Sequence, residues 1–179
     1  MKKSIITLVF ALSGMISYGQ LYLTRSGFIG FYSKTSVEDI KAENNQVYAV
    51  VDIGAKNLAF TTLVKGFIFP KELMQEHFNE NYMESDKYPK ASFSGTFTGD
   101  IDLKKDGVYP VMVKGRLSLH NATQDVAIPA TLEVKAGRIL GQSQFNIKPE
   151  DYHIDIPSLV RDKIAKELTV SVKVDCSPK

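Results

Sequence analysis

A strict two-residue alternation of side-chain character constrains the fold of this chain more than any other feature. In the segment 111–119, odd-numbered positions carry Val, Gly or Leu, and even-numbered positions carry Met, Lys, Arg or Ser. Because successive side chains of a β-strand point to opposite faces, this pattern predicts a strand with one buried face. Comparable alternation recurs in the segments 91–103, 126–134, 139–147 and 168–174. A series of such strands predicts an antiparallel sheet.

Short turn sequences separate these segments. Lys105-Asp106-Gly107 lies between 91–103 and 108–120, and Asp-Gly between alternating runs predicts a β-hairpin. Asn121-Ala122 and Ala136-Gly137 predict the next two turns. Earlier strands are predicted at 28–32, 47–53 and 58–63, and 64–69 is either a continuation of the last or its partner.

About eight such strands pack as a sandwich or close as a barrel. Closure is favoured by the length of the central strands and by inward glycines, which permit sharp coiling, at Gly95, Gly99, Gly115 and Gly141. We therefore predict an all-β fold, an extended eight-stranded antiparallel β-barrel with one or two short helices. The pattern leaves open whether the interior is hollow or filled by side chains.

One helix is predicted to begin at Pro70, because the missing N–H of proline suits the first turn of a helix. Its apolar face would carry Leu73, Met74, His77 and Phe78. Tyr88-Pro89 prevents continuation and favours extended backbone. A helix within an all-strand chain predicts a lid or plug on the barrel. Apolar residues at helical spacing also predict a second short helix over 157–167.

The first nineteen residues have the pattern of a secretory signal peptide. Met1-Lys2-Lys3 is basic, Ile5–Leu12 is apolar, and Ser17-Tyr18-Gly19 places small residues at the cleavage-defining positions. The apolar run is well short of the ~20 residues that span a bilayer. We expect a signal peptide over 1–19, one domain over 20–179, no stable membrane span after cleavage, and a periplasmic or secreted product.

Charge and cysteine content narrow the partners. The chain has 22 basic and 20 acidic residues, and without Lys2 and Lys3 the numbers are equal. This balance argues against nucleic acid as a partner. The single Cys176 cannot form an internal disulfide, although a cross-link between chains and a homodimer stay open.

The sequence carries few signs of catalysis. His77, His120 and His153 lie far apart, and neither a metalloprotease motif, a nucleophile elbow nor a phosphate-binding glycine loop is present. We therefore expect no enzyme, no metal and no cofactor. An enzyme acting on an isoprenoid lipid or a small stress metabolite remains the alternative if a histidine meets a carboxylate inside a pocket.

Three sequence blocks resemble the YceI-like polyisoprenoid-binding family, in the form found in Bacteroidetes-type bacteria. They are SDKYPKASF (85–93), GRLSLHNATQDVAIPATLEV (115–134) and QSQFNIKPEDYHIDIP (142–157). The resemblance implies an extended, lipocalin-like barrel with a long apolar cavity that binds a polyisoprenoid lipid, such as an isoprenoid quinone. The chain departs from the family at Asn121, where glycine is common, and at Gly66 and Ile68, where more polar residues are common.

A lipid site needs no motif, because each buried CH₂ contributes ~0.8 kcal/mol without a directed hydrogen bond. Its candidates are the bulky inward side chains, with Tyr82 as a gate: Phe60, Phe67, Met74, Phe78, Tyr82, Phe93, Phe97, Leu117, Leu119, Ile128 and Phe145. Candidate polar contacts at the rim are Thr61, Thr62, Ser143 and Asn146. The alternative is a packed envelope-stress or interaction β-domain whose own phenylalanines fill the interior.

Overall fold

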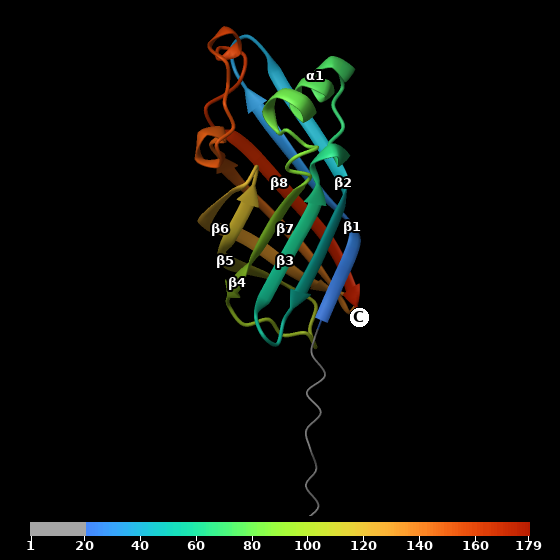
Figure 1. Cartoon of the computed structure of the whole chain (residues 1–179). Coiled ribbons are helices and arrows are strands. Elements are labelled where there is room, and N and C mark those ends of the chain that lie inside the picture. The colour runs from blue at the N-terminus through green and yellow to red at the C-terminus, as the bar shows by residue number, and fades with distance from the viewer. Residues whose placement is uncertain (1–20) are drawn as a thin grey trace, which may run out of the picture.

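The structure, a computed structural model, describes residues 21–179, so the predicted signal peptide lies outside the described residues. Within them, strands β1 to β8 form one closed barrel in which each strand pairs antiparallel with the next and β8 pairs with β1 (Figure 1). The predicted eight-stranded antiparallel barrel is confirmed. The strands are β1 Leu21–Lys34, β2 Asp39–Asp52, β3 Asn57–Leu63, β4 Lys90–Thr98, β5 Gly107–Leu119, β6 Ala122–Lys135, β7 Arg138–Ile147 and β8 Leu168–Pro178.

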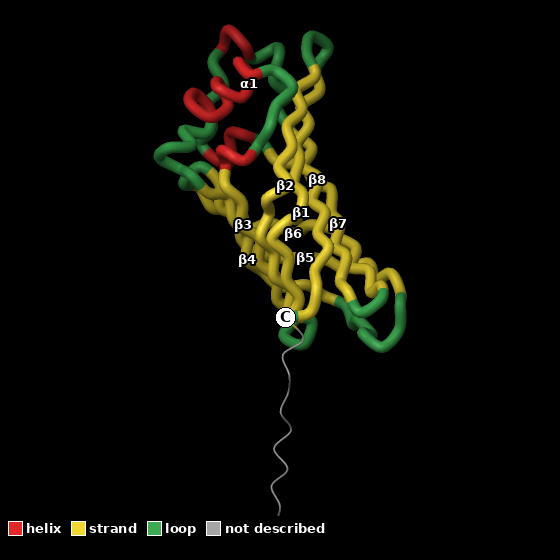
Figure 2. The backbone as a smooth tube through the Cα atoms, turned by 90° about the vertical axis from the view of Figure 1, so that its right-hand side faces the viewer, coloured by secondary structure: helices red, strands yellow, loops and turns green. Residues whose placement is uncertain are grey.

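The helical elements gather at one end of the barrel, which we call the lid end (Figure 2). The opposite end, the base, carries the turns that follow β2, β4 and β6. The predicted first helix is present as part of a segment, residues 70–89, that we call the lid. The helical elements are η1 Val64–Gly66, α1 Glu72–His77, the π-helical turn η2 Phe78–Tyr82, and the 3₁₀ turns η3 Pro149–Tyr152 and η4 Ser158–Val160.

Two hairpins turn through left-handed residues. His120 and Asn121 join β5 to β6 with φ of 48° and 60°, and Ala136 and Gly137 join β6 to β7 with φ of 50° and 73°. Positive φ at both central residues defines the turn whose twist matches that of the strands. Asn tolerates this conformation better than most residues, which suits Asn121 to a position where glycine was expected. The first of these turns begins one residue earlier than predicted.

The predicted hairpin between the two long strands is confirmed as the antiparallel pair β4 and β5, but the short turn predicted at Lys105-Asp106-Gly107 is wrong. β4 ends at Thr98, and Gly99, with φ of 117°, leads into a loop that runs to Asp106. The alternation continues through this loop because Ile101 and Leu103 fold back onto the apolar core of the base. The Asp106 carboxylate accepts a hydrogen bond from the Ala136 N–H at 3.1 Å, and so links the two base turns.

The predicted strand over 64–69 is also wrong, because buried Asn44 occupies the space beside it. The Asn44 amide donates to the Thr62 hydroxyl at 2.8 Å and to the Leu63 carbonyl at 3.0 Å, and the chain turns as η1. A Cβ on Gly66 would lie 2.5 Å from the Asn44 amide nitrogen, so glycine permits this close approach. Within 64–69, only Ile68 forms a β-bridge, to Glu43 of β2.

The predicted second helix over 157–167 is reduced to η4. No side chain caps its start. The Ala165 N–H instead donates to the buried Ser33 hydroxyl at 2.8 Å, which holds the segment against β1 in a non-helical path. Tertiary contacts therefore override the helical spacing.

The base half of the barrel is filled. Its core is a continuous cluster that includes Phe97, Val134 and Ile139. Above it, Gly95 and Gly115 face each other across β4 and β5, and the Phe93 ring lies over both. A Cβ on either glycine would come within 2.8 Å of the tip of that ring. The glycines thus let the ring lie flat against the wall, inside the barrel.

Candidate functional site

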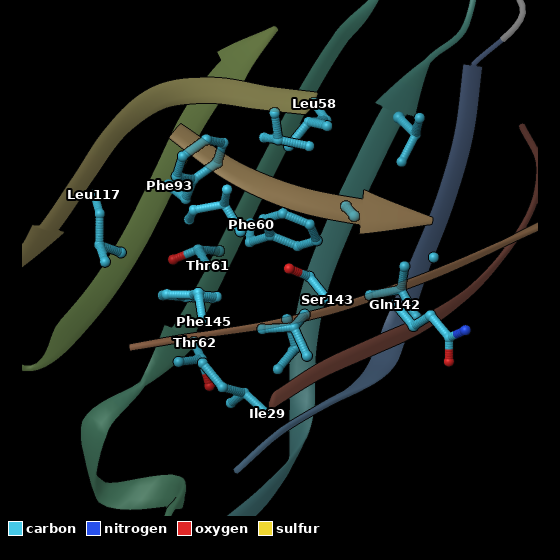
Figure 3. A pocket seen from close by; sticks show the side chains of 18 of the residues that line it. Ile29, Leu58, Phe60, Thr61, Thr62, Phe93, Leu117, Gln142, Ser143 and Phe145 are labelled. Atoms are coloured by element: carbon cyan, nitrogen blue, oxygen red, sulfur yellow. The ribbon is translucent and has the colours of Figure 1, made fainter. Parts of the chain in front are cut away.

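An apolar cavity of about 100 Å³, which we call the lower cavity, lies in the middle of the barrel above the packed base (Figure 3). Side chains from opposite walls point into it. The lining is apolar except for a few hydroxyl and amide groups. Its main apolar side chains are Ile29, Leu58, Phe60, Phe93, Leu117 and Phe145.

A larger cavity of about 400 Å³, the upper cavity, lies at the lid end between the lid and the segment 154–168. Met74, Phe78 and Tyr82 line it from the lid, and Ile154, Ile156, Val160 and Ile164 line it from the other side. Burial raises the pKa of the Tyr82 phenol above its ordinary value, which further favours the neutral form. Polar side chains border the cavity at Glu38, Lys71, His77 and Lys163.

The upper cavity lies directly beyond the lower cavity along the strands. On β1, Ile29 lines the lower cavity and Phe31, the next inward residue, lines the upper. On β7, Phe145 and Ile147 repeat this relation. Inward residues two positions apart are about 6.6 Å apart along a strand. The cavities are therefore stacked rather than separate surface features.

Four phenylalanines form an aromatic cluster at the lid end, and three of them, Phe31, Phe69 and Phe78, line the upper cavity. The Phe78 ring lies 5.6 Å from Phe31, 5.7 Å from Phe67 and 5.0 Å from Phe69, measured between ring centroids. Phe31 also contacts Phe67 and Phe69, at 5.6 Å and 5.8 Å. Tilted and offset aromatic pairs at these separations are mutually stabilising.

Polar contacts hold the lid at both of its ends. Lys71 forms an ion pair with Glu38 at 3.0 Å, which joins the start of the lid to the β1–β2 turn. The Phe69 N–H donates to the Gln75 side-chain carbonyl at 3.1 Å. At the far end, Glu84 lies 3.2 Å from the Nε2 atom of His120. The lid is thus attached to two different parts of the barrel.

His120 is a junction of three segments. Its Nδ1 atom lies 3.1 Å from the Tyr152 carbonyl oxygen, its Nε2 atom faces Glu84, and the Tyr88 ring packs edge-on at 4.7 Å. Both of its ring nitrogens therefore face acceptors. The histidine is 9 % exposed and lines neither of the two cavities described above.

The barrel wall is interrupted between β6 and β7. The two strands pair from Lys135 and Arg138 as far as Ala130 and Ser143, and then separate, whereas β7 continues to pair with β8. Pro129, which has no N–H, stands at the fork, and its carbonyl accepts a hydrogen bond from the Ser143 hydroxyl at 2.7 Å. Ser143 therefore closes the wall beside the lower cavity.

The structure distributes the predicted cavity residues over three places. The lower cavity brings together Phe60, Phe93, Leu117, Ile128 and Phe145, with Thr61, Thr62 and Ser143 of the predicted rim. The upper cavity brings together Met74, Phe78 and Tyr82. Neither cavity is lined by Phe67, Phe97, Leu119 or Asn146. Phe97 lies in the packed base, and Asn146 accepts a hydrogen bond from Thr169 on the outer surface.

Sequence reasoning missed one wall of the upper cavity, the segment 154–164. Its signal was present, because Ile154, Ile156, Val160 and Ile164 follow one another at short intervals. The spacing of Val160 and Ile164 instead predicts a helix over 157–167, and Ile154 and Ile156 carry no prediction. Ile29 and Val172, which line the lower cavity, were missed although both belong to alternating strands.

Residues 21–179 contain no group of three or more His, Cys, Asp or Glu side chains placed to hold a metal ion. Burial raises the pKa of the Cys176 thiol to about 11, which leaves it an unreactive thiol inside the base core. Among the same residues, none of the helices has the length and apolar character needed to cross a bilayer.

These features define a closed antiparallel barrel with a packed base, an apolar interior at mid-height and a lid over its hollow end. The family model for the YceI-like domain matches residues 22–176, and the chain belongs to the YceI-like family. No curated protein sequence matches the chain significantly.

Solved structures with the same fold share little sequence with this chain. A polyisoprenoid binding domain from Saccharophagus degradans, implicated in plant cell wall breakdown, has a TM-score of 0.73 and 14% identity over 90% of this chain and 99% of that one. BcnA of Burkholderia cenocepacia has a TM-score of 0.72 and 14% identity, over 84% and 96%. The YCEI protein of Campylobacter jejuni has a TM-score of 0.64 and 16% identity, over 82% and 89%.

Proposed function

We propose that this protein is a binding protein, not an enzyme, and that it holds a polyisoprenoid-type lipid such as an isoprenoid quinone. The observation that carries the proposal is the upper cavity, whose volume of about 400 Å³ falls within the range of small-molecule sites. The likeness to a polyisoprenoid binding domain supports the same ligand class. The N-terminal pattern supports export, and we place the mature protein in the periplasm or outside the cell.

The ligand's apolar chain occupies the upper cavity beside Met74 and Ile156, and its polar end stays near Lys71, His77 and Lys163. At ~30 Å³ for each carbon-sized group, the cavity holds roughly a dozen of them. Burying these contributes about 10 kcal/mol, of which association costs at least about 4 kcal/mol. The net free energy of binding is therefore at most about 6 kcal/mol, and the expected Kd is about 40 μM or weaker.

The first test is native mass spectrometry of the full-length gene product, purified from the envelope fraction of its host, with organic extraction of the bound material. The expected result is a stoichiometric apolar adduct that extraction identifies as a polyprenyl lipid or quinone. The same mass shows whether residues 1–19 are removed. A clean protein mass, unchanged after incubation with an isoprenoid quinone, would overturn the proposal and favour a packed interaction domain.

A pair of neighbouring substitutions tests the location of the site. Val160 is half-buried and lines the upper cavity, whereas Leu159 is 89% exposed and does not. Val160→Trp fills the cavity and should weaken binding of a quinone at least about tenfold, the loss expected for two displaced methylenes. Leu159→Trp should bind as the unmodified protein does. Equal binding by both variants would place the ligand elsewhere.

A further inference from the structure

We infer that Phe78 is a partition that sets the length of the apolar chain that the site accepts, an inference that rests on the proposed function. The side chain is half-buried, at the first position of the π-helical turn η2. Short π-helical turns are rare and frequently lie at functional sites. Phe78 belongs to the lid, whereas Phe31 belongs to β1, and Phe67 and Phe69 follow η1.

Phe78 lines the upper cavity and packs against two apolar clusters that other residues connect to the lower cavity. It packs against the apolar cluster around Phe67 and Phe69, and against a second cluster around Met83 and Tyr152. Residues that line the lower cavity pack against the same two clusters, Ile29 against the first and Leu117 against the second. Phe78 therefore contacts both clusters from the side of the upper cavity, and this places its ring on the path from the upper cavity toward the lower one.

The volumes show what this position controls. At ~30 Å³ for each carbon-sized group, an upper cavity of about 400 Å³ takes between two and three isoprene units. Removing the six ring carbons of Phe78 frees roughly 180 Å³ and joins the lower cavity of about 100 Å³ to the space. The enlarged site has room for nearly two further isoprene units. With Phe78 in place, a longer chain must leave its extra units in water.

The experiment measures chain-length preference with geraniol, farnesol and geranylgeraniol, which contain two, three and four isoprene units. Each alcohol displaces bound anilinonaphthalene sulfonate from the full-length protein, and the displacement gives its Kd. For the unmodified protein, affinity should increase from geraniol to farnesol and change less than about threefold from farnesol to geranylgeraniol. For Phe78→Ala, geranylgeraniol should bind at least about tenfold tighter than farnesol.

Phe97→Ala is the matched control, because Phe97 is a 3% exposed phenylalanine of the base that lines neither cavity. It should keep the preference of the unmodified protein. Phe78→Leu, a milder change, should shift the preference in the same direction as Phe78→Ala and guards against loss of the fold in the alanine variant.

The inference is overturned if the Phe78 variants bind the three alcohols in the same ratios as the unmodified protein, or if Phe97→Ala shifts the ratios equally. Loss of all binding by a folded Phe78→Leu variant would also overturn it, because Phe78 would then be a required contact and not a partition. Failure of the unmodified protein to bind any of the alcohols is a different result, and it contradicts the proposed function itself.

Discussion

The pair of glycines beneath Phe93 provides a sharp test of how the barrel wall is built. A methyl group at position 95 would lie 2.7 Å from the Gly115 Cα atom and 2.8 Å from the Phe93 ring, and closer still to the Lys114 carbonyl oxygen. Real Cβ atoms do not approach other atoms this closely. Two of the three obstacles belong to the backbone of β5, so Gly95→Ala must separate paired strands or displace the ring.

Overpacking of this kind costs typically 1–3 kcal/mol and occasionally more. Because Gly95→Ala meets backbone atoms of the paired strand, we expect a loss of about 3 kcal/mol. With an m-value of about 2 kcal/mol/M, the urea midpoint should fall by about 1.5 M. The assay is urea unfolding followed by far-ultraviolet circular dichroism.

Gly54→Ala is the control, because Gly54 lies in the turn after β2 and a Cβ there would meet only the Asp52 carboxylate, at an ordinary 3.5 Å. That variant should match the unmodified protein or gain up to about 1 kcal/mol from the less flexible unfolded chain. If Gly95→Ala and Gly54→Ala differ by less than about 0.5 kcal/mol, the tight contact between β4 and β5 does not exist in solution.

Two further predictions concern buried polar groups. Burial makes the folded protein hold the Cys176 proton more tightly than the unfolded chain, so stability present below pH 9.0 should be lost as the pH rises to about 11. Urea midpoints across that range should fall less for Cys176→Ala, and an equal fall in both proteins would contradict this. His120→Ala should lower the free energy of unfolding by about 2–4 kcal/mol, because the Tyr152 carbonyl loses its hydrogen-bond partner and the Tyr88 ring loses its packing contact. His153 has a similar φ but is exposed, so His153→Ala should lower the free energy of unfolding by less than about 1 kcal/mol in the same assay. Equal losses for the two variants would show that the contacts of His120 do not stabilise the fold.

The barrel could be predicted from the sequence because period-two alternation follows directly from the geometry of a strand. The same pattern gave the wrong end for β4, since Ile101 and Leu103 continue the alternation after the chain has left the sheet. Alternation records which side chains are buried and not which strands are paired. A glycine at position 99 was therefore interpreted as an inward residue of a strand, although it ends one.

The candidate site was harder to predict because alternation gives the face of a residue and not its height along the barrel. Phe93 and Phe97 lie four residues apart on one face of β4. The first lines the lower cavity and the second is part of the packed base. Where packing stops depends on how side chains from all the strands meet, and no single segment carries that information. The lid was predictable because Pro70 and Pro89 bound a segment without alternation.

The packed base offsets the free-energy cost of the unfilled space above it. An unfilled cavity costs ~24 cal/mol per Å³ in lost packing, so the lower cavity of about 100 Å³ costs roughly 2 kcal/mol. A domain with a total stability of 5–15 kcal/mol tolerates that only if the rest of its core is complete. Here the base cluster around Val134 and Ile139 is buried, and the barrel is closed by the pairing of β1 with β8. The interior above the base is therefore free to keep its cavities, and the side chains that border them are the ones whose exchange should change ligand preference before it changes the fold.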